Sequence, residues 1–355
     1  MYGVQGVLGR GSSEASVDRC RLLEGTTIKS LTPRLNSCGG RTLSISPENQ
    51  SEIESARSRL YETRRPTVPA LEAVLQNAYP VLDHGFVRVV DYMGDDAAIV
   101  QAARVSYGKG TKRVNEDAGL IRYLLQHQHS TPFEMAEIKF HIKLPIFVAR
   151  QWIRHRTANV NEYSARYSVL DNEFYIPDLG DLAAQSASNR QGRGDLLNTD
   201  AADKVLSILK TEAARAYENY LWLLGEHELA DAAKLEVGLA RELARISLPL
   251  SVYTQWYWKI DLHNLLHFLK LRADPHAQKE IRDYAKVIAE IVRLWVPSVF
   301  DAFIDFKRDA IVLSAPAVAV LKRMLSGEAV RREDSGLSRR DWDQLLSAFD
   351  LPTQE

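Results

Sequence analysis

Cysteine is almost missing from this chain of 355 residues, which contains only two. Cys20 and Cys38 both lie in the N-terminal stretch, away from every segment that is typical of a folded core. Their scarcity excludes a disulfide framework and a zinc site made of thiolates. It also removes cysteine from the possible nucleophiles of any site that the rest of the chain builds.

Long apolar runs and a surplus of charge are missing as well. No apolar run approaches the roughly 18 residues of a membrane-spanning helix, and the N-terminus lacks the apolar segment of a secretory signal. The formal net charge is -1, whereas a nucleic-acid-binding domain usually carries a basic surplus. We therefore expect a cytoplasmic, globular protein without nucleic-acid or membrane partners, in which a cluster of arginines serves a small anion.

A transit peptide is the alternative interpretation of the N-terminus, because several arginines stand among serines there. Such peptides are poor in acidic residues. Glu14, Asp18 and Glu24 break that rule, so the cytoplasmic prediction is kept.

Composition divides the chain into three parts. Residues 1–66 are rich in Ser, Gly, Arg and Glu and poor in aromatics, so we expect a mostly disordered extension there. A folded domain is predicted over 78–313. Residues 314–355 carry a charged run and a small helix around Trp342 to Phe349, and this C-terminal extension is either a helical hairpin or a docking segment.

Periodicity predicts the fold class. Apolar and polar residues alternate from Met135 to Leu144, which indicates a half-buried antiparallel strand, and Phe86 to Met93 and Leu250 to Ile260 have the β-branched and aromatic content of further strands. We expect an α/β (α+β) domain with a central, mostly antiparallel sheet flanked by long helices. Caps and apolar spacing predict helices over Asp95 to Arg104, Asn115 to the HSTPFE loop at His129, Pro145 to Arg156, Ala202 to Leu224, Ala230 to Ser247, Asp261 to Leu271 and His276 to Trp295. The polar stretch between Pro177 and Asp203 predicts a long loop of the kind that often forms a lid.

The most informative stretch is Gln151 to Ser168, QWIRHRTANVNEYSARYS, where Arg154, His155, Arg156 and Arg166 surround Glu162. Guanidinium groups bind phosphate with two hydrogen bonds and stay charged, and the Ser164 hydroxyl can complete the oxygen shell. Aromatic residues interleave the charges and would suit a planar base beside its phosphate. The alternative is a helix end whose arginines offset the helix dipole in solvent.

Other cationic and imidazole side chains are further candidates for a functional site. Arg272 closes a short helix, and functional sites gather at such element ends, whereas Arg241 and Arg245 also fit a solvated helix stripe. Asp261, His263 and His267 offer metal-ligand types at helical spacing. They lack the general-base glutamate that zinc proteases carry between two histidines, so the motif is weak. The chain has no GxGxxG, GxxxxGK[ST] or GxSxG motif, and the corresponding nucleotide and hydrolase folds have no support.

An ordered series of motifs resembles one family. Arg154-His155-Arg156 followed after seven residues by Ser164 is the signature of the flavin-dependent thymidylate synthases. The resemblance continues through ARVSY, HSTPFE, NEYSARYS, ARISLP and LRAD, which begin at Ala103, His129, Asn161, Ala244 and Leu271. It covers roughly residues 86 to 313 and leaves both ends outside.

The resemblance implies the thymidylate synthase-complementing protein fold and a homotetramer with active sites at subunit interfaces. It implies reductive methylation of dUMP to dTMP, with 5,10-methylenetetrahydrofolate as carbon donor, NADPH as reductant and FAD as hydride carrier. The positions that would contact dUMP are Gln151, Trp152, Ile153, Arg154, Glu162, Tyr163, Ser164, Ala165, Arg166, Arg245 and Arg272. Those that would contact FAD, from different subunits, are Ser106, His129, Arg154, His155, Arg156, Glu162, Asp261, Leu262, His263 and His267.

The residues agree with this chemistry on several points. Methylation of uracil without a flavin needs a cysteine thiolate to add to the ring, and the core has none. A fixed guanidinium at the ring edge can stabilise negative charge on the pyrimidine, and Arg272 is the candidate for this catalytic role. Ser164 has no Ser-His-acid partners, so we expect it to bind phosphate.

One departure from the family pattern leaves roles open. Asp261, Leu262, His263 and His267 stand where some members have asparagine and arginine against the flavin. The resemblance explains this cluster without a metal, so we expect none. A metal-dependent nucleotide hydrolase built on these residues and an RNA-binding module built on the arginines are the competing hypotheses.

Overall fold

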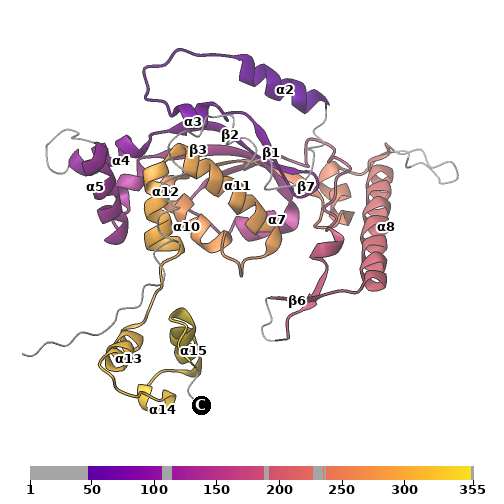
Figure 1. The fold of residues 1–355 in the computed structure, drawn as a ribbon. Helices are drawn as coiled ribbons and strands as arrows, with labels where there is room; N and C mark the ends of the chain where they lie inside the picture. Colours follow the sequence, from indigo (N-terminus) through magenta and orange to yellow (C-terminus); the bar gives the residue numbers. More distant parts are fainter. Residues whose placement is uncertain (1–46, 106–113, 188–191, 227–234, 236, 353–355) are drawn as a thin grey trace, which may run out of the picture. The chain divides into compact units, whose positions relative to one another are not determined.

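The computed structural model of the protein describes residues 47–105, 114–187, 192–226, 235 and 237–352. Contacts between residues divide the chain into two compact units, Met1–Asp301 and Ala302–Glu355. The first unit holds a five-stranded sheet with helices packed on it, and the second is helical (Figure 1). None of the helices in the described ranges combines the length and apolarity needed to span a bilayer.

All five strands of the sheet pair antiparallel, in the spatial order β1-β2-β3-β7-β4. The three central strands, β2, β3 and β7, are the ones that the sequence predicts, and the expected α/β (α+β) architecture is confirmed. The edge strands β1 and β4 are missed because four residues are too few for an alternating pattern to stand out. The strands span Ala78–Val81 (β1), Gly85–Met93 (β2), Glu137–Pro145 (β3), Asn159–Glu162 (β4) and Tyr253–Asp261 (β7).

One face of the sheet carries the core. Ile138, Phe140 and Ile142 of β3 are buried, as their alternation predicts. Trp256 and Trp258 of β7 stand opposite Ile142 and Phe140 and extend the same apolar face. Three helices pack on it, namely α7 (Ile146–Trp152), α10 (Leu262–Arg272) and α11 (Lys279–Trp295).

The other face of the sheet holds a buried arginine that has no carboxylate partner among the described residues. Arg88 on β2 is 4% exposed, and its Nη2 donates to Nδ1 of His141 on β3 over 2.7 Å. His141 donates in turn from Nε2 to Oε1 of Gln255 over 3.0 Å. A guanidinium cannot accept a hydrogen bond, so this imidazole is neutral. Burial and, after it, the charge of Arg88 lower the pKa of His141 to about 4.

We expect the free energy of unfolding to fall as the pH is lowered from 6.5 to 4, in part through His141. The unfolded chain takes up a proton near the ordinary histidine pKa of about 6.5, whereas the folded protein takes it up only near 4. The contribution of neutral His141 to the free energy of unfolding is therefore fully present above pH 6.5. Between pH 6.5 and about 4 it falls by about 1.4 kcal/mol for each pH unit. In His141→Asn, the amide oxygen still accepts from Arg88 but cannot be protonated. Urea unfolding at pH 7 and pH 5 should differ less in the variant, and equal differences in both proteins would show that His141 is not responsible.

The helix predicted over Ala230 to Ser247 is present only in its last part among the described residues. Much of its first half lies outside the described residues. Residues 237–240 are not helical, and a single helical turn, α9 (Arg241–Ala244), follows before a 3₁₀ turn at Arg245–Ser247.

Gly238 explains the difference, because it brings the chain back against the end of α8 (Thr199–Leu224). A Cβ at this glycine would lie 2.1 Å from the carbonyl oxygen of Leu224, so a larger residue could not approach this closely. Leu239 then donates its backbone N–H to the carbonyl oxygen of Leu223 over 2.7 Å. That oxygen is one that a helix end leaves without an internal partner.

The long loop predicted between Pro177 and Asp203 contains regular structure. A 3₁₀ turn at Leu179–Asp181 precedes a hairpin of β5 (Ala183–Gln185) and β6 (Arg193–Leu196). The side chain of Asn198 then accepts from the backbone N–H of Ala201 and starts α8 earlier than predicted. Short strands with polar, exposed side chains carry little periodic signal, which is why the sequence does not indicate them.

Two predicted caps are confirmed. The side chain of Asp95 accepts from the backbone N–H of Ala98 over 2.8 Å at the start of α4, and Asp261 accepts from that of Asn264 over 2.9 Å at the start of α10. The HSTPFE segment, predicted as a loop, includes one helical turn, α6. Within the predicted N-terminal extension, the described part includes a helix, α2, that its composition does not indicate. The elements outside the sheet core are α2 (Pro47–Ser58), α3 (Pro69–Glu72), α4 (Asp96–Val105), α5 (Val114–Gln126) and α6 (Thr131–Glu134).

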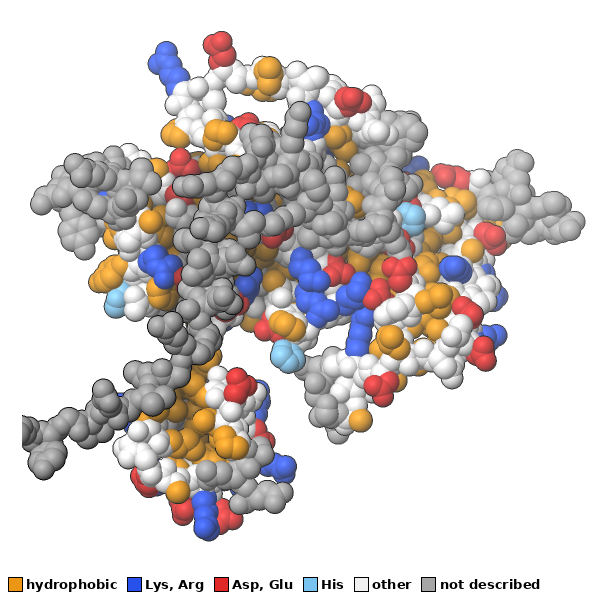
Figure 2. All heavy atoms as spheres, viewed as in Figure 1, with side chains coloured by type: hydrophobic (Ala, Val, Ile, Leu, Met, Phe, Trp, Pro, Cys, Tyr) orange, Lys and Arg blue, Asp and Glu red, His pale blue; other side chains and the backbone are white. Residues whose placement is uncertain are grey.

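The second unit has a small core of its own. Trp342, Leu345 and Leu346 pack with Val320 and Val330, and orange hydrophobic side chains stand among charged ones over these helices in Figure 2. The helical C-terminal extension expected from the sequence is thereby confirmed. After the end of α12 (Pro297–Phe303) and a π-helical turn at Ile304–Arg308, its helices are α13 (Ala315–Leu325), α14 (Arg332–Ser335) and α15 (Arg339–Ala348).

Candidate functional site

The arginine-rich segment begins where α7 ends. Trp152, the last residue of α7, is fully buried, and its ring stacks on Phe268 of α10 with 4.6 Å between centroids. The helix therefore stops at Trp152 and does not continue to Arg156 as predicted, because the chain must turn back to pair β4 with β7. Ile153, Arg154 and Arg156 are exposed in this connection, and neither arginine has a carboxylate partner among the described residues.

Strand β4, at the edge of the sheet, brings Glu162 opposite the middle of β7. Glu162 stands opposite Trp256 in the β4 and β7 pair, and its Oε1 accepts a hydrogen bond from Oγ1 of Thr254 over 2.8 Å. Tyr163 continues the pairing with a backbone bond to Gln255. Thr254 is not among the site residues predicted from the sequence. The signal was present, since Thr254 is the polar position on the otherwise apolar face of its strand.

The turn that follows is closed by local bonds. The Ser164 carbonyl oxygen accepts from the backbone N–H groups of Tyr167 and Ser168, and its Oγ accepts from that of Arg166 over 3.3 Å. Ala165 next to it is buried. The serine hydroxyl is therefore held at a fixed place on the surface of the domain.

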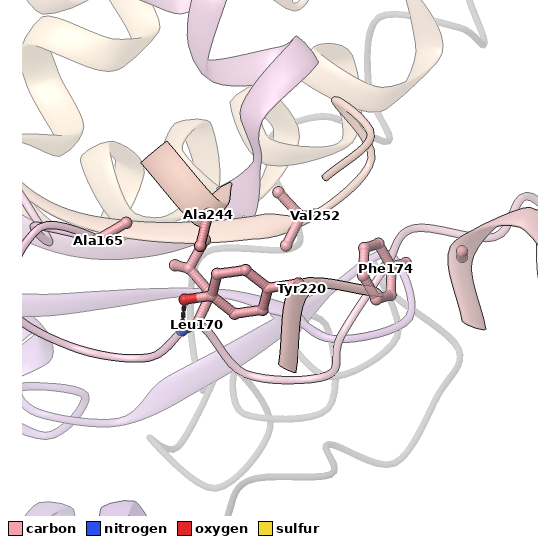
Figure 3. Packing of buried hydrophobic residues seen from close by; sticks show 7 residues of the cluster. Ala165, Leu170, Phe174, Tyr220, Ala244 and Val252 are labelled. Atoms are coloured by element: carbon pink, nitrogen blue, oxygen red, sulfur yellow. Dashed lines mark hydrogen bonds between the residues drawn. The ribbon is translucent and has the colours of Figure 1, made fainter. Parts of the chain in front are cut away.

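Packing against α8 also holds the Ser164 turn in place. Figure 3 shows Leu170 and Ala244 beside the ring of Tyr220, a residue of α8, and Ala165 belongs to the same buried cluster. The backbone N–H of Leu170 donates to the Tyr220 hydroxyl over 3.3 Å. This apolar cluster ties the Ser164 turn to the segment that carries Arg245.

A cavity of about 290 Å³ opens at this junction. Its volume is at the lower end of that of small-molecule sites, about 300 to 1,000 Å³. Five residues of its wall are ones that the sequence assigns to nucleotide binding, Glu162, Tyr163, Ser164, Ala165 and Arg245. The rest of the wall is not predicted from the sequence and consists of Ile146, Leu170, Leu248, Pro249, Leu250, Val252 and Thr254.

The cavity combines the groups that a nucleoside phosphate needs. Arg245 supplies a guanidinium whose only hydrogen bond among the described residues is a long one, 3.4 Å from Nε to the carbonyl oxygen of Glu242. Ser164 supplies a hydroxyl, and the apolar wall suits a planar ring. The Arg166 side chain does not line the cavity in this structure. Its Nε instead pairs with the Glu242 carboxylate over 3.1 Å at the surface.

A second group forms around Arg272 at the end of α10. Nε of Arg272 donates to Nε2 of His155 over 2.9 Å. Burial lowers the pKa of Arg272, and burial, Arg272 and His267 in that order lower the pKa of His155 to about 4. The imidazole is therefore neutral at physiological pH.

The start of α10 holds the remaining predicted flavin residues. Asp261 is the helix cap and accepts two hydrogen bonds from Asn264. Leu262 is buried, whereas His263 and His267 are exposed on the helix surface. Within the described ranges, no three His, Cys, Asp or Glu side chains are placed to hold a metal ion.

Three other predicted residues stand apart from both groups. The amide oxygen of Gln151 is buried without a hydrogen-bond partner among the described residues, which marks it as a free acceptor. His129 is exposed after α5, with its ring 5.9 Å from that of Tyr123. Ser106 lies outside the described residues. Among the described residues, no hydrogen bond, ion pair or ring contact joins His129 to Arg272, to His155 or to the cavity wall.

Comparisons with known proteins show the family. Residues 88–298 match the family model described as thymidylate synthase complementing protein. The chain is 59% identical over 308 residues to the flavin-dependent thymidylate synthase of Gluconobacter oxydans, covering 87% of this chain and 99% of that protein. It is 60% identical over 301 residues to the enzyme of the same name from Ruegeria pomeroyi, covering 85% and 97%.

The chain belongs to the flavin-dependent thymidylate synthases.

A solved structure extends the comparison to the fold. The UMP/dUMP methylase PolB of Streptomyces cacaoi, bound with 5-Br UMP, aligns with a TM-score of 0.56 at 34% identity, over 63% of this chain and 95% of PolB. As a flavin-dependent thymidylate synthase, the chain is an enzyme of the methyltransferase class. The family resemblance stated from the RHR motif and its companions is confirmed.

Proposed function

We propose that this flavin-dependent thymidylate synthase converts dUMP to dTMP, with 5,10-methylenetetrahydrofolate as carbon donor, NADPH as reductant and FAD as hydride carrier. The observation that carries the proposal is the cavity, whose wall joins the serine of the RHRx7S motif to Arg245. The relatives are named for thymidylate synthesis, and PolB is described as a dUMP methylase. The cytoplasmic location proposed for the enzyme rests on composition.

We assign the phosphate of dUMP to Ser164 and Arg245, because a hydroxyl and a guanidinium without a carboxylate partner among the described residues form strong hydrogen bonds with phosphate oxygens. Glu162 and Tyr163 line the same cavity. Arg272 stabilises the negative charge that develops on the pyrimidine when a hydride adds to it.

The exposed cations and imidazoles fit a flavin dinucleotide. Arg154 and Arg156 have no carboxylate partner among the described residues, and His263 and His267 are exposed on α10. Guanidinium groups suit the pyrophosphate of FAD. Bound FAD supplies the hydride that a thiolate-free site needs. A homotetramer whose sites combine residues of several subunits belongs to the same proposal and rests on the family resemblance.

The proposal predicts a yellow protein. After purification, the flavin absorption should bleach under NADPH, and dUMP with methylenetetrahydrofolate should then give dTMP. A colourless protein that cannot take up added FAD would overturn the proposal. Loss of activity on treatment with a chelator would instead favour the metal-dependent hydrolase.

Arg245→Ala should raise the KM for dUMP by about 10- to 100-fold, since a hydrogen bond to a charged group contributes about 1.5 to 3 kcal/mol. The flavin content should not change, because the substitution removes a contact to the nucleotide alone. Steady-state kinetics at saturating folate measure the effect. Arg293→Ala on α11, which breaks a surface pair with Glu290, is the matched control and should leave KM unchanged. An unaltered KM in Arg245→Ala would remove this residue from the site.

A further inference from the structure

The bond between Arg272 and His155 fixes the protonation state of both residues. A guanidinium has only donors and keeps its charge, so Nε2 of His155 must be the acceptor of the 2.9 Å hydrogen bond. The ring proton is then on Nδ1. His155 is thus a neutral imidazole in a single tautomer.

The ring of His155 is itself held in place. Its backbone N–H donates to the carbonyl oxygen of Trp152, the buried end of α7. The edge of the imidazole meets Phe268 with 5.0 Å between centroids and an angle of 75°. Phe268 and Arg272 are one helical step apart on α10, so the same helix face supports the ring and offers it the donor.

A neutral acceptor has a consequence that a carboxylate would not have. An aspartate or glutamate at this place would neutralise the field of the guanidinium, whereas an imidazole orients it and leaves its positive charge uncompensated. Arg272 is partly buried, and no described residue pairs a carboxylate with it. Its charge remains available to a ligand.

We propose that His155 is a positioning residue for Arg272, in addition to any contact with the flavin. It holds Nε of the guanidinium by accepting its hydrogen bond, so that the two terminal nitrogens face the uracil ring with full charge. The proposal rests on the proposed function, because it gives Arg272 its orientation for the activation of dUMP.

Two variants separate positioning from flavin binding. The amide oxygen of glutamine reaches the place of Nε2, whereas that of asparagine reaches only the place of Nδ1. His155→Gln should therefore keep dTMP formation per bound FAD within about fivefold of the wild type. His155→Asn should lose about 10- to 100-fold in the same quantity, the scale of a misplaced catalytic group. Normalising to bound FAD, measured by absorbance, keeps partial loss of cofactor or of folded protein out of the comparison.

A double-mutant cycle on dUMP affinity gives the deciding result. His155→Asn should weaken dUMP binding to the FAD-loaded protein when Arg272 is present, and should have no further effect in the Arg272→Ala background. Equal effects in both backgrounds, or equal rates per FAD in the Gln and Asn variants, would overturn the positioning role. Absence of dTMP from the wild type would instead overturn the proposed function.

His141→Asn is the control for this experiment, because His141 accepts from Arg88 in the same kind of pair on the sheet face away from the helices. Its rate per bound FAD should equal that of the wild type. A matching loss in this variant would show that disturbing any buried arginine and histidine pair slows the enzyme, which contradicts the proposal.

Discussion

Replacing Arg272 by alanine should lower dTMP formation by at least about 100-fold, the cost of removing one fixed electrostatic group from a transition state. Burial lowers the pKa of Arg272, so this charge is held partly away from water, where it acts strongly on a ring that becomes negative. Bound FAD and NADPH oxidation should persist, because the assigned role concerns the pyrimidine. Parallel measurement of NADPH consumption and dTMP by chromatography separates the two half-reactions.

The control for this variant is Lys270→Ala. Lys270 lies in the same last turn of α10 and is also a cation, yet it belongs to neither group of the site. It should leave dTMP formation unchanged. If Arg272→Ala also forms dTMP at the wild-type rate, the guanidinium does not activate the base.

Trp152→Ala should destabilise the protein by about 3 to 5 kcal/mol, the usual cost of removing a large buried aromatic. The Trp152 ring is fully buried, and Trp258, Phe268 and Tyr284 surround it with centroids between 4.6 and 5.8 Å away. Loss of this contact also frees the connection that carries Arg154 and His155. Urea unfolding followed by far-UV circular dichroism measures the change.

Two further variants sharpen this prediction. The indole N–H of Trp152 is buried without a hydrogen-bond partner among the described residues, so Trp152→Phe keeps most of the packing, removes an unsatisfied donor and should cost less than about 2 kcal/mol. Tyr167→Ala changes an aromatic that is 73% exposed and should stay within about 0.5 kcal/mol. Similar losses in the Trp152→Ala and Tyr167→Ala variants would contradict the packing account.

The parts of the fold that the sequence predicts are those whose signals are local. Alternation places Ile138 and Phe140 on the core face of β3, and the short side chains of Asp95 and Asp261 mark two helix starts. Each depends on residues within one element. The sheet order does not, since β4 pairs with β7 across almost a hundred residues of chain.

The failures have tertiary causes. The helix expected up to Ser247 is interrupted because Gly238 approaches the carbonyl oxygen of Leu224, a contact between two elements. The helix expected through Arg156 stops at Trp152, since the buried indole fixes the end of α7 and the chain turns toward β7. Apolar spacing alone cannot show either contact.

The residues of the candidate site also divide into those that the sequence identifies and those that only the fold brings together. A spaced motif identifies Ser164, and the family resemblance adds Arg245 and Arg272. The residues that complete the cavity, such as Thr254 and Leu248, are ordinary strand and loop positions, and only folding brings them to Ser164. The pairing of His155 with Arg272 joins residues 117 apart in sequence, so no local pattern predicts it.

A crystal structure of the assembled protein with dUMP and FAD tests the central claim most directly. The account predicts the phosphate against Ser164 and Arg245 in the 290 Å³ cavity, with the terminal nitrogens of Arg272 at the uracil edge and its Nε still bonded to His155. A nucleotide bound elsewhere, with the cavity empty and Arg272 turned away from the base, would contradict it.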